Sequence, residues 1–468
     1  MRIHGSGRLA GAGAGIVLVA AVLAACEPDP VRSTLDRPVS PVVLDGADLP
    51  ALAGAPVGDV VAFRASSAGW TQIPVQVDER LATTVADVYD LPPDQFNSST
   101  AIPISAYADP TTFAGADPDP ALDADDEVVF MARDAGGRAP GSTPAGTVPG
   151  TGVEVRLDDP AVPGATGYVY LFRSSTLDPS AGASYVDYDF SLASGDYRTT
   201  YNRTAGPNPE DSTITGSTYT AHFADRWLLD EVTLTHGDRS GVDIVDRMKY
   251  RLIPGQCGRT EDTFDAGEGA FVVNKVGPVR GLRSYVGANS GPNTQATHAF
   301  YGTSIETTVD LRVHAIPGVA SYLDLDRDAF GMTFRSPQAA GRVQVDGQPD
   351  AVATGVPSWW TFLGPQGGLG VSASVDTDLP LTPATRYEDD VTPATTQCTG
   401  DGEAVGEAGA TIGAVDCTDP GLTGDCGHHL RSRTVMVAAV SIATPAELQH
   451  WAEQAGQPLT ATTSAWTP

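Results

Sequence analysis

The stretch GAFVVNKVGPVRGLRSYVG, residues 269–287, contains two segments rich in β-branched and aromatic residues. Gly277 and Pro278, both typical turn residues, separate the two segments. Short segments of this kind bounded by turn residues predict antiparallel strands joined by a turn. Because side chains alternate between the two faces of a strand, we expect Arg283 and Tyr285 on the same face.

The same pattern extends over most of the chain. Between residues 57 and 173 the strand-like segments are short, and from about residue 185 they become longer. Examples are VGDVVAFRA (57–65), DEVVFMA (126–132), GYVYLF (167–172), YVDYDFSL (185–192), GVDIVDRMKYRLI (241–253), GLGVSASVD (368–376) and RTVMVAAVSI (433–442). We therefore predict an all-β protein, with a smaller N-terminal β-domain at 46–180 and a large antiparallel β-sandwich at 181–443.

One helix is predicted near the C-terminus. In TPAELQHWAEQAG, Thr444 can cap the helix, Pro445 suits its first turn and Gly456 can end it. Residues 444–468 are accordingly expected to form a short helix and a tail. The composition agrees with a mainly β protein, because the chain of 468 residues contains 51 glycines and 36 prolines.

The charge balance is strongly acidic, with 58 Asp and Glu against 28 Lys and Arg and a net charge of −30. A phosphate backbone would be repelled by such a field, so we expect no nucleic-acid partner. The chain also lacks a Gly-x-Ser-x-Gly elbow, a His-Glu-x-x-His motif and a Walker loop. These absences disfavour a serine hydrolase, a zinc protease and a nucleotide enzyme.

The N-terminus predicts export. Residues 1–25 have a short basic start followed by an apolar run of small residues, as in a secretory signal peptide. The sequence Leu23-Ala24-Ala25-Cys26 resembles the lipobox of bacterial lipoproteins. The resemblance implies cleavage before Cys26, a lipid on its sulfur, and anchoring on the outer side of the cytoplasmic membrane or on the cell surface of a bacterium. Residues 26–45 are then a Pro-rich tether. The alternative is a plain transmembrane anchor, although the apolar run at 9–25 is short for a span.

Four further cysteines fit an oxidising compartment. They are Cys257, Cys398, Cys417 and Cys426. We expect them to form two disulfides, for which three connectivities are possible.

No Asp or Glu occurs between Gly269 and Ile305, although the chain is acidic. One hypothesis for this window is β-elimination on a uronate, in which Tyr285 or His298 removes the proton next to the carboxylate. Tyr301 and His314 are alternative bases. Arg283 and Asn289 would hold the carboxylate.

A ligand surface is the second use of these basic segments. Arg247, Lys249 and Arg251 share one strand face, Arg312 and His314 share another with Asp310, and Arg280 lies in the acid-free window. If the strands are neighbours, their polar faces form one patch for a carboxylate-bearing or sulfated polysaccharide. Trp359 and Trp360 could stack on sugar rings. The alternative is a solvated sheet face whose charges satisfy one another.

Acidic residues concentrate before one predicted strand, at Asp123, Asp125, Asp126 and Glu127. Carboxylate oxygens suit Ca²⁺, so calcium is the one cofactor expected. An ordinary acidic turn is the alternative.

Three stretches extend the resemblance beyond the lipobox. WTQIPVQVDER (70–80), LDADDEVVFMARDAG (122–136) and GPVRGLRSYVGANSGP (277–292) resemble a group of exported bacterial lipoproteins of unassigned function. The long strands also resemble large β-sandwich proteins that act on polysaccharides, which implies fold only. The expected function is recognition of a polysaccharide. The alternatives are a polysaccharide lyase acting on uronate-containing glycans and a structural envelope protein that binds a protein partner.

Overall fold

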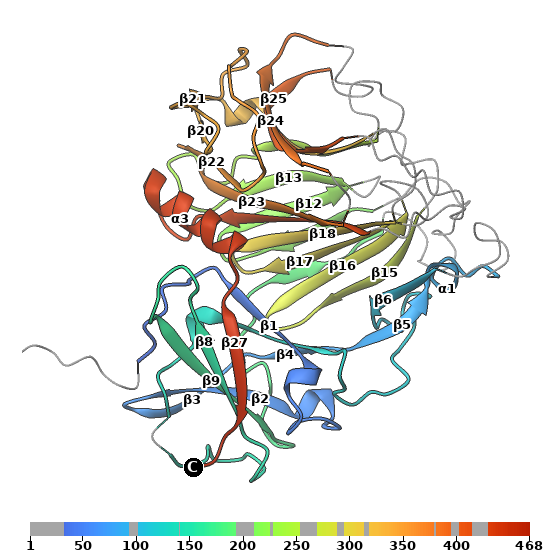
Figure 1. Ribbon diagram of the computed structural model, residues 1–468, viewed down its shortest axis with the longest axis vertical. Helices are drawn as coiled ribbons and strands as arrows, with labels where there is room; N and C mark the ends of the chain where they lie inside the picture. The colour runs from blue at the N-terminus through green and yellow to red at the C-terminus, as the bar shows by residue number, and fades with distance from the viewer. Residues whose placement is uncertain are drawn as a thin grey trace, which may run out of the picture.

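The computed structural model describes residues 32–92, 102–139, 141–192, 210–224, 228–252, 269–287, 294–312, 318–378, 381–394, 402–413 and 429–468. It confirms an all-β fold of antiparallel sheets with a short helix near the C-terminus. Two lobes lie end to end, with the early part of the chain in the lower lobe (Figure 1). Cys26 and the other four cysteines lie outside the described residues.

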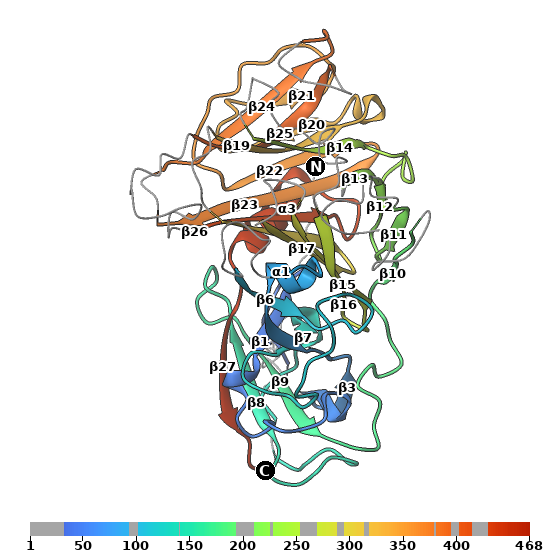
Figure 2. The same ribbon diagram turned by 90° about the vertical axis from the view of Figure 1, so that its right-hand side faces the viewer.

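The lower lobe is built from the short strands that the sequence predicts. Its five-stranded sheet has the order β27-β8-β9-β2-β3, and a three-stranded sheet has the order β1-β7-β4. The strands are β1 (Pro41–Asp45), β2 (Val60–Ser66), β3 (Gly69–Ile73), β4 (Gln76–Asp78), β7 (Glu127–Met131), β8 (Val153–Asp158), β9 (Thr166–Arg173) and β27 (Thr460–Ala465). A separate pair, β5 (Arg80–Thr84) and β6 (Pro103–Tyr107), and the short helix α1 (Val85–Val88) lie at the top of this lobe. Figure 2 shows this pair close to the upper lobe.

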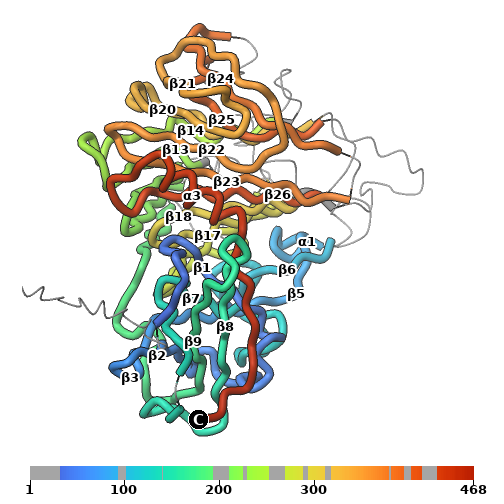
Figure 3. Tube along the Cα trace, turned by 60° about the vertical axis from the view of Figure 1, so that its left-hand side comes forward, coloured from blue at the N-terminus to red at the C-terminus, as the bar shows by residue number. Residues whose placement is uncertain are grey.

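The C-terminal strand β27 belongs to the lower lobe. After crossing from the upper lobe it runs beside β8, as Figure 3 shows, and pairs with it from Thr460 to Ala465. Trp466 then packs edge to face against Phe172 and Trp70, with ring centroids 5.5 and 5.7 Å apart. A tail is the expectation from sequence for this segment, because TATTSA has few apolar residues to mark a strand. Part of the expected tether is likewise paired, since β1 forms a ladder with β7.

The upper lobe is a large antiparallel sandwich. Its nine-stranded sheet has the order β15-β16-β17-β18-β26-β23-β22-β20-β21, and two four-stranded sheets have the orders β10-β11-β12-β13 and β14-β19-β25-β24. The nine strands are β15 (Gly269–Val276), β16 (Arg280–Gly287), β17 (Gln295–Tyr301), β18 (Ser304–Arg312), β20 (Thr333–Arg335), β21 (Val343–Gln344), β22 (Trp359–Gly364), β23 (Gly367–Thr377) and β26 (His429–Ala438). The others are β10 (Asp187–Asp189), β11 (Ser212–Thr215), β12 (Tyr219–Ala224), β13 (Leu228–Leu234), β14 (Val245–Leu252), β19 (Val319–Leu325), β24 (Ala384–Asp390) and β25 (Ala404–Ile412). One core joins the three sheets, with Phe223, Phe300 and Phe362 fully buried in it.

The predicted helix is confirmed as α3 (Pro445–Gly456). Thr444 caps it in a capping box with Glu447, and Pro445 occupies its first turn. Leu448 and Trp451 pack into a cluster with Val435 and Val437 of β26. None of the helices in the described ranges is long and apolar enough to cross a membrane.

A buried arginine ties this helix to the lower lobe. Arg37 donates to Asp159 at 2.8 and 2.5 Å, and to the backbone oxygens of Gln454 and Gln457 at 2.9 Å. The last two acceptors lie at the C-terminal end of α3, where backbone carbonyls lack helical partners. The Arg37 side chain therefore joins the start of the described chain, the lower lobe and the helix.

Candidate functional site

The nine-stranded sheet has polar residues on both of its faces. Arg283, on the inner face, stacks over Phe223 of the opposing strand β12, at 4.3 Å from the guanidinium carbon to the ring centroid. Tyr301, on the outer face, packs with Val129 and Met131 of the lower lobe. Alternation along the strands therefore sends one set of side chains into the sandwich and the other set towards the lower lobe.

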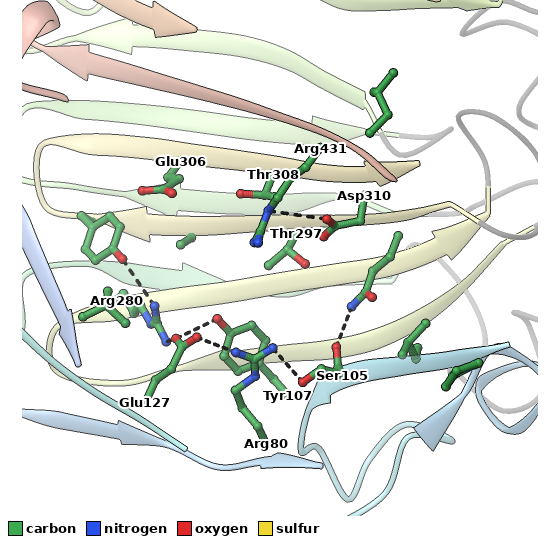
Figure 4. Close-up of a pocket in the computed structure, with 17 residues that line it drawn as sticks. Arg80, Ser105, Tyr107, Glu127, Arg280, Thr297, Glu306, Thr308, Asp310 and Arg431 are labelled. Carbon is green, nitrogen blue, oxygen red and sulfur yellow. Dashed lines mark hydrogen bonds and ion pairs between the residues drawn. The ribbon is translucent and has the colours of Figure 1, made fainter. Parts of the chain in front are cut away.

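A cavity of about 530 Å³ lies on the outer face, where the sheet meets the lower lobe. We call it the junction cavity. Its polar lining comes from strands far apart in the sequence: β5 and β6, β7, and β16, β17, β18 and β26. The residues are Arg80, Ser105, Tyr107, Glu127, Arg280, Gln295, Thr297, Tyr301, Glu306, Thr308, Asp310 and Arg431. Figure 4 shows them facing one another across the space between the two lobes.

Arg280 forms the floor of the junction cavity. Its guanidinium lies 2.8 Å from Asp78, 2.6 Å from Glu127 and 3.4 Å from the hydroxyl of Tyr301. Burial alone would raise the pKa of Asp78, but the charges of Arg280 and Lys275 and a hydrogen bond from Gln76 hold it below its usual value. The floor is therefore a fixed, ionised network rather than a free cation.

Tyr107 and Arg80 form one wall. The Tyr107 hydroxyl donates to Glu127 at 2.9 Å, and Arg80 donates to Glu127 at 2.9 Å and to Ser105 at 2.7 Å. The guanidinium carbons of Arg80 and Arg280 lie 5.2 and 5.4 Å from the centroid of the Tyr107 ring. Figure 4 shows Glu127 between the two arginines. These contacts hold the ring and the carboxylate in one orientation, which lowers the entropic cost of binding a ligand.

The opposite wall is more open. The Arg431 and Asp310 side chains are 59% and 51% exposed, and their closest atoms are 3.5 Å apart. Thr297 on β17 and Thr308 on β18, the strand that also carries Asp310, lie between Arg431 and the floor (Figure 4). Glu306 makes two bonds to Arg433, at 2.6 and 2.9 Å. The wall thus offers hydroxyl, carboxylate and guanidinium groups that a ligand can reach.

Charges balance in the lining of the junction cavity. Its described cations are Arg80, Arg280 and Arg431, and its described anions are Glu127, Glu306 and Asp310, so the sum is 3 − 3 = 0. Each of the three arginines already lies beside a carboxylate. An anionic ligand would have to compete with these pairs, whereas an uncharged ligand with several hydroxyl groups would not.

The residues predicted for β-elimination come together, but inside the sandwich. His298 lies opposite Arg283 in the register of β16 and β17, and its ring centroid is 6.0 Å from that of Tyr285. The three residues are 0–2% exposed. Arg283 makes a bidentate pair with Glu210, at 2.9 and 2.5 Å, which the sequence analysis did not foresee. Burial and the charge of Arg283 lower the pKa of His298 well below its usual value, so the ring is neutral. Asn289 and His314 lie outside the described residues.

The expected single basic patch does not form. The strand β14 pairs with β19 in the four-stranded sheet, so Arg247, Lys249 and Arg251 lie in a different sheet from Arg280. Arg251 is buried, and Arg247 bonds to its neighbour Asp246 at 2.9 Å. Alternation along β14 is as predicted, but strand pairing is set by the whole fold. Arg312 is the last residue of β18.

Lys249 is fully buried between two carboxylates. Its amine lies 2.6 Å from Asp324 and 3.2 Å from Glu407. Burial raises the pKa of Asp324 to about 8; Lys249 opposes the shift and Glu407 adds to it. The other oxygen of Glu407 lies 3.5 Å from Arg386 Nε, so two cations and two carboxylates share this network. The cluster is therefore a structural unit and not a ligand surface.

The tryptophan pair is divided as alternation requires. Trp360 is 4% exposed and belongs to the core, whereas Trp359 is partly exposed. Neither is among the described residues that line the junction cavity. Stacking of Trp359 on a sugar stays a prediction.

The acidic turn is held by its own backbone. The Asp126 side chain accepts hydrogen bonds from the backbone amides of Arg80 and Asp123, at 2.9 and 3.0 Å. The Asp123 side chain accepts from the amide of Asp125 at 3.1 Å. Glu127, the fourth predicted ligand, lines the junction cavity instead. Hydrogen bonding between the Asp123 and Asp125 side chains raises the pKa of Asp125 to about 6. Within the described ranges, no group of three or more Asp, Glu, His or Cys side chains is placed to hold a metal ion. Calcium binding stays a prediction.

Most of the junction cavity was missed at the sequence level. Of its polar lining, the sequence analysis singled out Arg280, Tyr301, Glu127 and Asp310, each for a different reason. Tyr107, Thr297 and Thr308 carry no local signal, because hydroxyl groups on the open face of a strand are common. Only the approach of the lower lobe to the sheet makes them one site.

No family model matches the chain, and no curated protein matches it. Solved structures that are similar to about half of it include the following two. The protein HI1317 has 6% identity and a TM-score of 0.31, over 48% of this chain and 92% of its own. A putative aldose 1-epimerase from Escherichia coli K12 has 12% identity and a TM-score of 0.29, over 50% of this chain and 99% of its own. TM-scores this low carry no argument about fold or function.

Proposed function

We propose that this protein recognises a polysaccharide, and that the junction cavity binds uncharged sugar units of it. The observation that carries the proposal is the ordered network of guanidinium, carboxylate and phenol groups around Glu127. Such groups donate to and accept from sugar hydroxyls, and their mutual bonds fix them before the ligand arrives. The balanced lining favours neutral sugars over the uronate or sulfated sugars expected from the sequence.

The test is a binding assay with neutral, uronate-bearing and sulfated polysaccharides. We expect binding to a neutral polymer and weaker binding to the charged ones. In the Arg431→Ala variant the affinity should fall about three- to tenfold, because one hydrogen bond from a charged donor contributes on the order of 1 kcal/mol at a partly exposed site. Arg156→Ala is the matched control, since Arg156 is 51% exposed, bonds to Asp158 and lies on β8 away from the cavity. Equal loss in both variants, or no loss in either, would count against the junction cavity.

Elimination at Tyr285 and His298 is the second candidate. It is favoured by the side-chain nitrogens His298 Nε2 and Arg283 Nη1, which are buried without hydrogen-bond partners in the described part of the chain. A neutral imidazole is the form that can take a proton, although the strongly lowered pKa of His298 makes it a weak base. Following the masses of the polysaccharides in the same assay decides the matter, because elimination leaves an unsaturated sugar at the new chain end. If no polymer binds and none is shortened, the third candidate, an envelope protein that binds a protein partner, is favoured.

We further propose that a lipid on Cys26 anchors the protein on the outer side of the bacterial cytoplasmic membrane or on the cell surface. The support is the signal peptide followed by Leu-Ala-Ala-Cys. Replacing Cys26 by serine should move the protein from the membrane fraction to the soluble fraction, because no thiol remains to carry the lipid. A serine variant that stays in the membrane fraction after a carbonate wash would contradict the anchor.

A further inference from the structure

A second cavity lies between the facing sheets of the upper lobe. We call it the inter-sheet cleft; its volume is about 60 Å³. It lies towards one end of the strands, since its lining includes Val319, the first residue of β19, and Ile412, the last residue of β25. Leu430, near the start of β26, lines it from the nine-stranded sheet. The junction cavity lies on the outer face of that sheet, and Leu430 borders both spaces.

Small residues create this space. Ala373 of β23 faces it from one sheet, and Ala408 and Ala410 of β25, two residues apart, face it from the other. At a usual sheet separation of about 10 Å, small side chains on both sides leave a gap that larger ones would fill. The gap is therefore a property of the residues at these positions and not of the strand arrangement.

The chemistry of the lining is uniform. None of the described residues that line the cleft carries an Asp, Glu, Lys, Arg or His side chain, although the chain as a whole is highly charged. Apolar groups such as Met248, Leu323 and Val371 predominate, and seven of the lining residues carry a hydroxyl group. A charged group could not be neutralised in this space, so only an uncharged one can enter at low cost.

Two residues that line the cleft have a buried donor without a hydrogen-bond partner in the described structure, Trp360 and Tyr322. The Tyr322 ring lies beside the guanidinium of Arg386, 5.3 Å from its carbon to the ring centroid, so Trp360 is the donor considered for the cleft. Trp360 is 4% exposed, and its indole nitrogen is buried with no hydrogen-bond partner in the described structure. An indole N–H can only donate, and a buried donor without a partner is unfavourable. An acceptor atom delivered into the cleft would satisfy it.

We infer that the inter-sheet cleft binds the end of an uncharged ligand that is mainly hydrocarbon and carries an acceptor oxygen, such as the ester end of an alkyl chain. The apolar lining takes the hydrocarbon, the absence of charge excludes a carboxylate, and the Trp360 N–H supplies the hydrogen bond. The small volume limits the buried part to a few non-hydrogen atoms, so the rest of a longer ligand lies outside the cleft.

Methyl octanoate is the probe, and sodium octanoate is its charged counterpart. In calorimetric titrations of the full protein we expect the ester to bind at least tenfold more tightly than the carboxylate. In Trp360→Phe the ester should bind three- to tenfold more weakly, because the ring shape is kept and the donor is lost. Nonane, which has no acceptor, should bind this variant as it binds the original protein. If nonane also binds Trp360→Phe three- to tenfold more weakly than it binds the original protein, the loss comes from packing. That result would overturn the role of the N–H.

Filling the cleft is the second arm of the test. Ala373→Leu should abolish ester binding. If the leucine variant does not fold, the smaller Ala373→Val is used, and it should weaken ester binding. Near-ultraviolet circular dichroism checks that each variant keeps its tertiary packing. Ester binding that is unchanged in a folded Ala373→Val protein, octanoate binding as strong as ester binding, or no binding of either probe would overturn the inference.

Discussion

Replacing Glu210 by alanine should lower the free energy of unfolding of this protein by about 3–5 kcal/mol, as expected when one partner of a buried ion pair is removed. Glu210 and Arg283 have no exposed side-chain surface, and they share two hydrogen bonds. The alanine variant leaves the guanidinium of Arg283 buried without its counter-charge. Urea unfolding followed by circular dichroism measures the loss.

Two further variants separate the effect of burying the charges from the effect of the ion pair. Glu403→Ala removes the partner of Arg327, whose side chain is 57% exposed, and should lower the free energy of unfolding far less than Glu210→Ala, because solvent screens an exposed pair. The double variant Glu210→Leu, Arg283→Met replaces both charges with apolar groups and should recover much of the stability, since apolar replacements of a buried pair are often neutral. A double variant as unstable as Glu210→Ala would show that the pair is favourable in itself.

The stability of the upper lobe should fall as the pH rises from about 4 to about 8, through the titration of Asp324. The pKa of this carboxyl is about 8 in the folded protein and 3.8 for an ordinary aspartate. A raised folded-state pKa gives a contribution that is fully present below the unfolded-state pKa and is lost as the pH rises through the folded-state pKa. Between these two pKa values the folded state keeps a proton on Asp324 that the unfolded state has lost. The free energy of unfolding therefore falls by about 1.4 kcal/mol for each pH unit of increase.

The Asp324→Asn variant isolates this contribution. The amide resembles the protonated carboxyl in shape but does not titrate, so the slope of unfolding free energy against pH should be smaller than in the original protein. Urea unfolding at pH 5, 6, 7 and 8 measures both slopes. Parallel slopes would show that Asp324 is ionised throughout, with Lys249 outweighing its burial.

Strand and helix formation could be predicted because their signals are local. The capping box of α3 lies within four residues of sequence, from Thr444 to Glu447, and was predicted in part. Alternation along β16 likewise places Arg283 and Tyr285 on one face in both the prediction and the structure. Such features depend only on backbone geometry and near neighbours.

The sequence did not predict which face of each strand points into the sandwich and which points outward. All eight residues of β16 are buried, so the strand shows no contrast between an apolar and a polar side. Arg280 and Arg283 look equivalent in sequence. One meets Asp78, 202 residues away, on the outer face, and the other meets Glu210, 73 residues away, inside the sandwich.

The sequence by itself determined the all-β class, the division into short and long strands, and the capped helix. Tertiary structure alone decided that β14 pairs with β19, that β27 returns to the lower lobe, and that β5, β6 and β7 close over the outer face of the nine-stranded sheet. Local backbone preferences act over a few residues, whereas strand pairing and the burial of charges minimise the free energy of the whole chain. The junction cavity results from such long-range pairing, because its walls are contributed by segments up to 388 residues apart, from Val43 to Arg431.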